Sequence, residues 1–302
     1  MRPHLLLFAC TLAILSASAS ATPPDWGSPA IKRPDGMPPK NNTTPMFAPH
    51  VDDSARWAQV PGCARDIVGG MQDVIYVTGC DVVPNSHGSS QFYRWNGSSF
   101  VPFPVAGHGS AIATYGFHSY TIGGDALLYS RSGEGEWQKR GTPDGRPITD
   151  VGAGKFGLWV VTARPNGEGG NAIARAMPCA NGDRLLPDKD FCGWEEMPGA
   201  AVRISVGNTA WVVNAQGQIF EWQDNAGGYW LKRPGCFRDV AANGSSVYAV
   251  GCKRGNGDGN AIYRWTYSGW SDAKGAGKRV AVDAMGYAWA ITDSGDIWRR
   301  VP

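Results

Sequence analysis

Tryptophan and other aromatic residues recur along this chain, one at the start of each copy of a longer repeated pattern. These openers are Trp57, Phe100, Trp137, Trp194, Trp230 and Trp270, which lie 43, 37, 57, 36 and 40 residues apart. An aromatic face packs against the C–H groups of a sugar ring, and planar polar side chains bind its hydroxyl groups. The candidates for such stacking are Trp137, Trp194, Trp230 and Trp270, with Tyr93 and Tyr263. The alternative is that these rings pack between sheets as core, where aromatic side chains contribute most.

Planar polar side chains gather in two loop segments, 163–170 and 253–259. They are Arg164, Asn166 and Glu168 in the first segment and Arg254, Asn256 and Asp258 in the second. We predict that Arg164, Asn166, Arg254 and Asp258 contribute to carbohydrate binding. The run 255–260 is rich in oxygen atoms but lacks the spaced carboxylates of a calcium loop. We therefore predict no metal and no cofactor, with calcium as the alternative for this run.

The repeats that carry these residues are built from strands alone. Each opener is followed by a strand of small residues such as Ile204–Val206, then by a bulkier strand, and then by a third that reads Ile219-Phe-Glu-Trp222 in one copy. Periods of about 40 residues made of strands are typical of β-propellers. We predict an all-β, six-bladed propeller of four-stranded antiparallel blades. The strand around Trp57 has no earlier partner, so we expect it to join the last three strands and close the ring.

A second pattern alternates from repeat to repeat. The residue before the innermost strand is Asp66, Asp150 or Asp239 in odd repeats and Ala111, Arg203 or Arg279 in even ones. The loop after the second strand is long in odd repeats and tight in even ones. These patterns predict three copies of a two-blade unit, with charge pairs such as Arg279 with Asp66 around the centre. We interpret the pairs as structural, because ion-pair networks perturb charges without forming functional sites.

The N-terminal part of the chain has the composition of a targeting segment and a linker. Residues 1–21 contain an apolar run followed by Ala19-Ser-Ala21, as in a signal peptide. Residues 22–51 contain eight prolines and are predicted to be a linker or tail. The propeller then occupies 52–302, where no segment is apolar enough to span a membrane. We expect a secreted protein, or a periplasmic one if the source is a Gram-negative bacterium.

Cysteine usage agrees with export. The cysteines beyond the predicted signal peptide are Cys63, Cys80, Cys179, Cys192, Cys236 and Cys252. An even number in an exported chain favours disulfides. Cys63 and Cys236 occupy one position of the repeat, and Cys80 and Cys252 occupy another, at the open end of the same predicted hairpin. We therefore predict the bonds 63–80 and 236–252, which leaves 179–192 as the third.

Charge and motifs argue against two classes of function. The net charge is +2 and the basic residues are scattered, whereas a nucleic-acid groove needs a concentrated basic face. The chain contains neither His-Glu-x-x-His nor Gly-x-Ser-x-Gly, which are motifs of metalloproteases and of serine hydrolases. We therefore predict neither nucleic-acid binding nor enzymatic activity.

Three consecutive phrases of the fourth repeat resemble the tectonin repeat. They are Arg203-Ile-Ser-Val-Gly207, Ala210-Trp-Val-Val-Asn214 and Gly217-Gln-Ile-Phe-Glu-Trp222. That repeat builds the propeller lectins of fish eggs, horseshoe crab blood and some fungi and slime moulds. The similarity spans Trp57 to Pro302, with departures such as Phe100 as an opener and Ala174 in place of an aromatic residue. The resemblance implies a six-bladed, multivalent lectin that recognises microbial or cell-surface glycans.

The leading hypothesis is therefore a secreted, non-enzymatic lectin whose partners are glycans. The alternative is a propeller scaffold for protein–protein interaction, with its loop-rich face as the platform. A hydrolase or lyase is the third hypothesis. It ranks last because the inner strands offer mainly Asp–Arg pairs instead of converging acid and base groups.

Overall fold

The computed structural model describes residues 56–70, 74–103, 108–133, 135–167, 169–179, 191–225 and 227–302. All of them belong to one compact unit, Asn42–Pro302. The predicted signal peptide, 1–21, and the predicted linker, 22–51, lie outside the described residues. Within the described ranges, no helix has the length and apolar content that a membrane crossing requires.

Four separate sheets contain four antiparallel strands each. The first consists of β6 (Ala111–Tyr115), β7 (His118–Ile122), β8 (Leu128–Ser132) and β9 (Gln138–Lys139). After a short 3-10 turn, Pro143–Gly145, the second consists of β10 (Ile148–Gly154), β11 (Gly157–Asn166), β12 (Gly170–Pro178) and β13 (Phe191–Ala201). The third consists of β14 (Arg203–Val206), β15 (Ala210–Val213), β16 (Ile219–Gln223) and β17 (Tyr229–Arg233). The fourth consists of β18 (Phe237–Asn243), β19 (Ser246–Arg254), β20 (Asn260–Trp265) and β21 (Trp270–Gly277).

The remaining strands form one eight-stranded sheet that joins the two ends of the described chain. Its order is β22 (Arg279–Val282), β23 (Ala288–Ile291), β24 (Asp296–Val301), β1 (Arg56–Gly69), β2 (Ile75–Val82), β3 (Ser90–Trp95) and β4 (Phe100–Pro102), with β5 (His108–Gly109) paired to β3. β1 pairs with β24 through residues 56–63 and with β2 through residues 64–69. A register shift lies in each of these pairings.

This sheet corrects the prediction of six separate blades. The structure has four separate four-stranded blades and one eight-stranded sheet. The physical reason is that β1 is a continuous strand of 14 residues, which is long enough to pair with a different partner in each half. The prediction of an all-β propeller of four-stranded antiparallel blades is confirmed in its general form.

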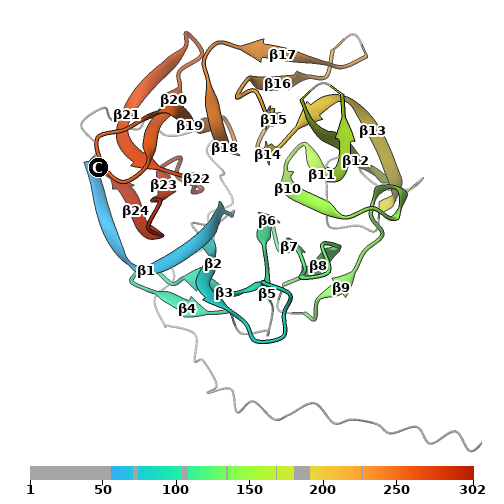
Figure 1. Cartoon of the computed structure of the whole chain (residues 1–302), viewed down its shortest axis with the longest axis horizontal. Coiled ribbons are helices and arrows are strands. Elements are labelled where there is room, and N and C mark those ends of the chain that lie inside the picture. The colour runs from blue at the N-terminus through green and yellow to red at the C-terminus, as the bar shows by residue number, and fades with distance from the viewer. Residues whose placement is uncertain are drawn as a thin grey trace, which may run out of the picture. The chain divides into compact units, whose positions relative to one another are not determined.

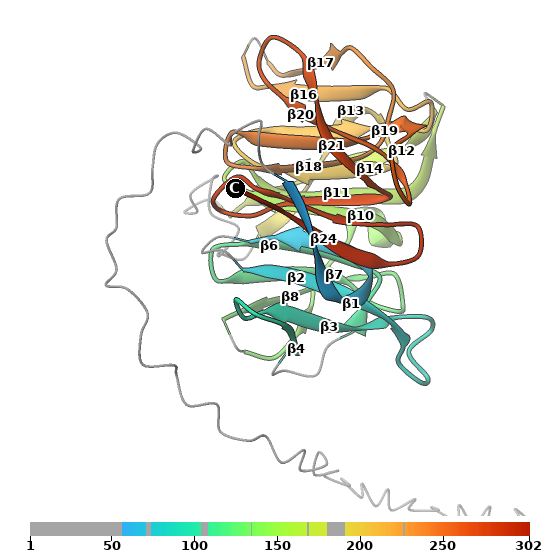
Figure 2. The same ribbon diagram turned by 90° about the vertical axis from the view of Figure 1, so that its left-hand side faces the viewer.

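The sheets are arranged around a centre lined by the first strand of each repeat (Figure 1). The inner strands β1, β6, β10, β14, β18 and β22 contact one another in this order, and β22 contacts β1. Viewed from the side, neighbouring sheets lie against each other through their faces (Figure 2). Because both faces of a sheet are then covered, strands read as continuous apolar runs rather than as alternating ones. In β11, for example, Trp159, Val160 and Val161 are all fully buried.

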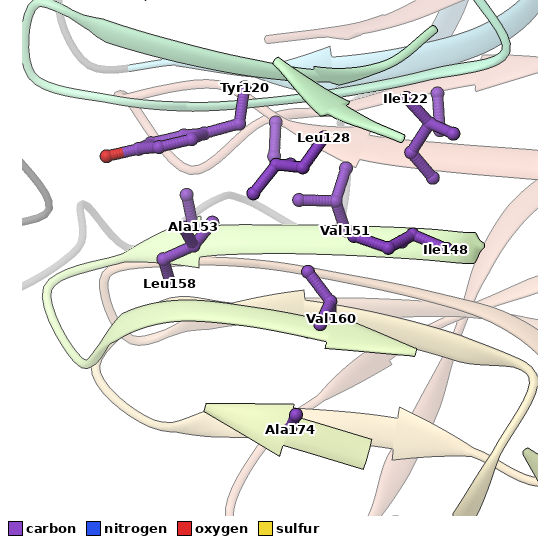
Figure 3. Packing of buried hydrophobic residues seen from close by; sticks show 11 residues of the cluster. Tyr120, Ile122, Leu128, Ile148, Val151, Ala153, Leu158, Val160 and Ala174 are labelled. Atoms are coloured by element: carbon purple, nitrogen blue, oxygen red, sulfur yellow. The ribbon is translucent and has the colours of Figure 1, made fainter. Parts of the chain in front are cut away.

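The hydrophobic core is divided into clusters that lie between adjacent sheets. One cluster joins Tyr120, Ile122 and Leu128 of the first separate sheet to Ile148, Val151, Ala153, Leu158, Val160 and Ala174 of the second. Figure 3 shows these side chains filling the space between the two sheets. Small residues such as Ala153 occur on the inner strands, where the sheets approach one another most closely. The core clusters lie between sheets. A surface to which two sheets both contribute therefore lies where one repeat meets the next.

The structure contains the three predicted disulfides. The Cα–Cα distances are 5.5 Å for Cys63–Cys80, 4.8 Å for Cys179–Cys192 and 5.4 Å for Cys236–Cys252. The first and third occupy equivalent positions, and each packs against a tight turn of the preceding repeat. At one of these turns Gly217 has φ +77°, and a Cβ there would come within 2.8 Å of Cys236 Sγ. Glycine is therefore required at this turn both for its backbone angle and for the space that the disulfide occupies.

Candidate functional site

The long loops that were predicted to bind ligand contact the tight turn of the following repeat. The amide of Ala215 donates to the carbonyl of Gly169 at 2.7 Å. The amide of Ser294 donates to the Asp258 carboxylate at 2.8 Å. In the third long loop, the carbonyl of Ser86 lies so close to Gly124 that a Cβ there would come within 2.1 Å of it. These loops therefore hold successive repeats together.

The four polar candidates in these loops all have partners within the protein. Arg164 forms an ion pair with Glu196, and Arg254 forms one with Asp293. The side-chain amide of Asn166 donates to the carbonyl of Gly199 at 2.8 Å. Asp258 accepts the Ser294 amide and also lies 3.9 Å from Arg254. Their polar atoms are thus engaged in connecting neighbouring segments. Among the described residues, no three His, Cys, Asp or Glu side chains are grouped to hold a metal ion.

The opening tryptophans are half-buried, and three of them bridge neighbouring repeats. The indole N–H groups of Trp57, Trp194 and Trp230 donate to the backbone carbonyls of Ala273, Gly141 and Pro198, at 2.9, 2.9 and 2.7 Å. Each acceptor lies three or four residues after the opener of the preceding repeat. In the described part of the chain, the indole nitrogens of Trp137 and Trp270 are buried without a hydrogen-bond partner. The opening tryptophans therefore pack between sheets, and part of each ring stays exposed at the surface.

The sequence reasoning missed the residues that surround the openers at the boundaries between sheets. At the boundary of the second and third separate sheets, Trp159 packs edge to face against Trp222 and Trp230, with ring centroids 5.7 and 5.9 Å apart. The Arg175 guanidinium lies 5.5 Å from the Trp159 centroid. Glu195 accepts hydrogen bonds from Arg175 at 2.7 and 3.2 Å. Aromatic surface and a charged, hydrogen-bonding pair thus meet at one place.

An arginine beside a cluster of aromatic rings occurs at two other places, with different neighbours, and we call the three places the aromatic junctions. At the boundary of the third and fourth separate sheets, Arg233 lies 5.0 Å from the Trp265 ring and pairs with Glu221. Within the eight-stranded sheet, Arg299 lies 5.2 Å from the Trp289 ring. The aromatic sets are Trp159, Trp222 and Trp230; Trp211, Trp265 and Trp270; and Trp289, Trp95 and Phe100. Of the predicted stacking residues, Trp230 and Trp270 belong to these junctions, whereas Trp137 and Trp194 do not.

Part of this pattern was visible in the sequence. An arginine follows the buried aliphatic residue of the third strand by two positions in several repeats, as in Ile173 to Arg175 and Ile297 to Arg299. No spacing in the sequence identifies the partner glutamates, because strand pairing decides which residues meet. Glu195 lies directly opposite Arg175. Arg233 lies opposite Ile219, which is two residues from Glu221. Register shifts between β12 and β13 hide the first of these pairings from a reading of spacing alone.

Charged side chains also surround the centre of the sheets, and we call them the axial ring. It consists of Asp66, Asp150, Asp239, Arg203 and Arg279. Arg203 lies 3.8 Å from both Asp150 and Asp239, and Arg279 lies 3.9 Å from Asp239 and 3.4 Å from Asp66. The predicted pair of Arg279 with Asp66 is thus confirmed. Ala111 occupies the sixth position, so three carboxyl groups face two guanidinium groups.

Each axial aspartate also binds the backbone of the next inner strand. Asp150 accepts the amide of Ile204 at 2.8 Å, and Asp239 accepts that of Val280 at 2.9 Å. Burial raises the pKa of Asp66 and Asp150 to about 6 and that of Asp239 to about 8, against the opposing effect of Arg203. The ring therefore connects the inner strands and takes up protons in the range of mild acid to neutral pH.

This ring predicts that stability falls as the pH rises from 5 to 8. The folded pKa values exceed the unfolded value of about 3.9, so the folded chain binds these protons more tightly than the unfolded chain. The stabilisation is complete below about pH 4 and is lost as the pH rises through the folded pKa values. Melting followed by circular dichroism should give a higher Tm at pH 5 than at pH 8. The variant Asp239→Asn should show a smaller difference; an unchanged difference would contradict this assignment.

Comparison with known proteins supports the fold and does not identify a family. No family model matches the chain, and no curated protein matches it. Among solved structures, a streptogramin B lyase is 13% identical with a TM-score of 0.50 and covers 82% of this chain and 97% of that chain. The SapL1 lectin in complex with alpha methyl fucoside is 14% identical with a TM-score of 0.48 and covers 81% and 94%. YCF48 from Cyanidioschyzon merolae is 14% identical with a TM-score of 0.47 and covers 82% and 98%.

At these identities the similarity concerns the fold alone. The resemblance to tectonin repeats stays a prediction. Any function must therefore be argued from the residues of this chain.

Proposed function

We propose that this chain is a non-enzymatic carbohydrate-binding protein and that the aromatic junctions are its sites. The observation that carries the proposal is the Arg175–Glu195 pair beside the cluster of Trp159, Trp222 and Trp230. The pair offers planar donors and acceptors for hydroxyl groups, and the half-buried Trp230 offers an aromatic edge for C–H groups. Asp224, 3.9 Å from Arg175, adds an exposed carboxylate from the next sheet.

The recurrence of the arrangement supports multivalency. Successive repeats place the same strands side by side, so a site formed at one boundary is reproduced at others. We further propose that the eight-stranded sheet acts as two blades joined by β1, which makes the molecule a six-bladed ring of tectonin type. The three disulfides are compatible with an extracellular protein, and we propose that the chain is exported.

The proposal predicts that Arg175→Met weakens binding to the sugars that the chain recognises by about tenfold. A hydrogen bond to a charged group contributes about 1.5 kcal/mol, which corresponds to that factor. Ligands would be identified on a glycan array with the full chain, and affinities measured by isothermal titration calorimetry. The matched control is Lys155→Met, an exposed residue in the turn between β10 and β11. Absence of binding to any sugar on the array would contradict the proposal.

A protein-interaction platform remains the second candidate function, supported by a different observation. Phe117 and Tyr267 are 69% and 78% exposed. They lie in the connection between β6 and β7 and in that between β20 and β21. Connections of the first to the second strand and of the third to the fourth strand fall at the same end of antiparallel sheets. A partner that is retained by the wild type and released by Phe117→Ser with Tyr267→Ser would favour this function.

A further inference from the structure

The aromatic junction within the eight-stranded sheet differs from its counterparts in charge. Arg299 and Arg175 occupy equivalent places: each follows a buried isoleucine by two residues, and each lies over a buried tryptophan of the second strand. The distances from guanidinium to ring centroid are 5.2 Å for Arg299 over Trp289 and 5.5 Å for Arg175 over Trp159. These two arginines can therefore be compared directly.

The difference lies in the residue opposite each arginine. Arg175 faces Glu195 across the β12–β13 pair, whereas Arg299 faces Ala58 across the β24–β1 pair. In the part of the chain that the structure describes, Arg299 has no carboxylate within ion-pair distance, and its guanidinium lies over the Trp289 ring. Its Nε is buried and lacks a hydrogen-bond partner among the described residues. Arg299 is thus an uncompensated guanidinium at a site that elsewhere holds an ion pair.

One carboxylate that contacts the same tryptophan, Asp283, already accepts other hydrogen bonds. The Asp283 carboxylate accepts the Trp289 indole N–H at 3.2 Å and the Tyr287 amide at 2.8 Å. It therefore serves the turn between β22 and β23. The next residue, Arg300, donates to the Tyr248 hydroxyl at 3.2 Å. No described carboxylate pairs with Arg299 as Glu195 pairs with Arg175.

An unpaired, partly buried guanidinium favours one chemical class of ligand. Leaving a charged donor desolvated without an acceptor is costly, and the planar group of arginine matches a carboxylate with two parallel hydrogen bonds. The ring beneath this guanidinium belongs to an aromatic cluster: Trp95 lies 5.3 Å from Trp289, and Phe100 lies 5.2 Å from Trp95. A ligand with a carboxylate on an otherwise C–H-rich ring would satisfy both features.

We infer that the junction of Arg299, Trp289, Trp95 and Phe100 binds the carboxylate of an acidic sugar, such as a uronic acid. The Arg175 and Arg233 junctions, in which a glutamate already neutralises the arginine, bind neutral sugars instead. This inference rests on the proposed function and adds to it a difference in specificity between the junctions. The Arg299 junction selects anionic glycans.

The test is calorimetric titration of the full, disulfide-bonded chain with glucuronic acid and with its uncharged methyl ester. The wild type is expected to bind the acid at least about tenfold more tightly than the ester, because a charged pair replaces a neutral contact. Arg299→Gln should remove this preference, so that the acid and the ester bind with equal affinity. Ala58→Glu, which supplies the carboxylate that Arg175 already has, should remove it as well with Arg299 still in place. Raising the salt concentration should weaken binding of the acid more than that of the ester.

A gain-of-function variant provides the matched control. The double variant Glu195→Ala with Asp224→Asn removes both carboxylates that lie within ion-pair distance of Arg175, so it should create a second site and raise the stoichiometry for glucuronic acid from one to two. If the wild type binds neutral sugars but shows no preference for the acid, or if Ala58→Glu retains that preference, the inference is overturned while the proposed function stands. If no sugar binds at all, the proposed function fails and the inference fails with it.

Discussion

Replacement of Arg203 by methionine is expected to lower the free energy of unfolding by about 3 kcal/mol at pH 8. Arg203 lies between two aspartates of the axial ring, and its own pKa is raised by the carboxylates of Asp150, Asp239 and Asp66 against the lowering effect of burial. Methionine keeps the volume of the side chain and removes its charge. The three carboxyl groups would then face Arg279 alone, and breaking a buried pair by removing one partner is strongly destabilising.

The measurement is urea unfolding of the wild type and the variant at pH 8 and at pH 5. The loss should be smaller at pH 5, because burial already favours protonation of Asp239 there. The double variant Arg203→Met with Asp150→Asn should recover part of the loss, since the uncompensated carboxylate is removed. An equal loss at both pH values, with no recovery in the double variant, would show that packing and not charge explains the effect.

Trp159→Ala is expected to cost about 4 kcal/mol, the largest effect of any single truncation considered. Trp159 is fully buried between the second and third separate sheets. It contacts Trp222 and Trp230 and stacks on Phe156 at 6.0 Å, and its indole N–H donates to the Phe156 carbonyl at 3.2 Å. Alanine would leave a cavity whose walls are held by two different sheets, so the cavity cannot collapse easily.

Differential scanning calorimetry of the variant tests this expectation. The control is Phe117→Ala, because Phe117 is 69% exposed and exposed substitutions usually change stability by less than about 0.5 kcal/mol. If Trp159→Ala and Phe117→Ala melt at the same temperature, the view that the core lies between sheets is wrong.

The sequence predicts the parts of this molecule that depend on the repeat. Cys63 with Cys80 follows from equivalent repeat positions, and so does the ion pair of Arg279 with Asp66. In both cases the partners occupy defined ends of neighbouring strands. The four-stranded antiparallel blade follows from the same regularity.

What the sequence does not predict depends on cross-strand register. Glu195 reaches Arg175 only because of shifts in the β12–β13 pairing, and no spacing rule gives such a shift. The ion pair of Arg254 with Asp293 likewise depends on how a long loop lies over the tight turn of the next repeat. The count of separate sheets was missed because β1 continues without a break from one pairing to another.

The continuity of β1 has a consequence for how the chain reaches its native state. Trp57 lies opposite Arg300 in the sheet, so the outer half of β1 can pair with β24 only after residue 300 has left the ribosome. Closing a loop of this length costs about 5 kcal/mol of chain entropy, and contacts of such high sequence separation slow folding. Until then the outer edge of β1 is an unpaired template for aggregation. We expect the nascent chain to depend on chaperones, and its maturation to be completed by that last pairing.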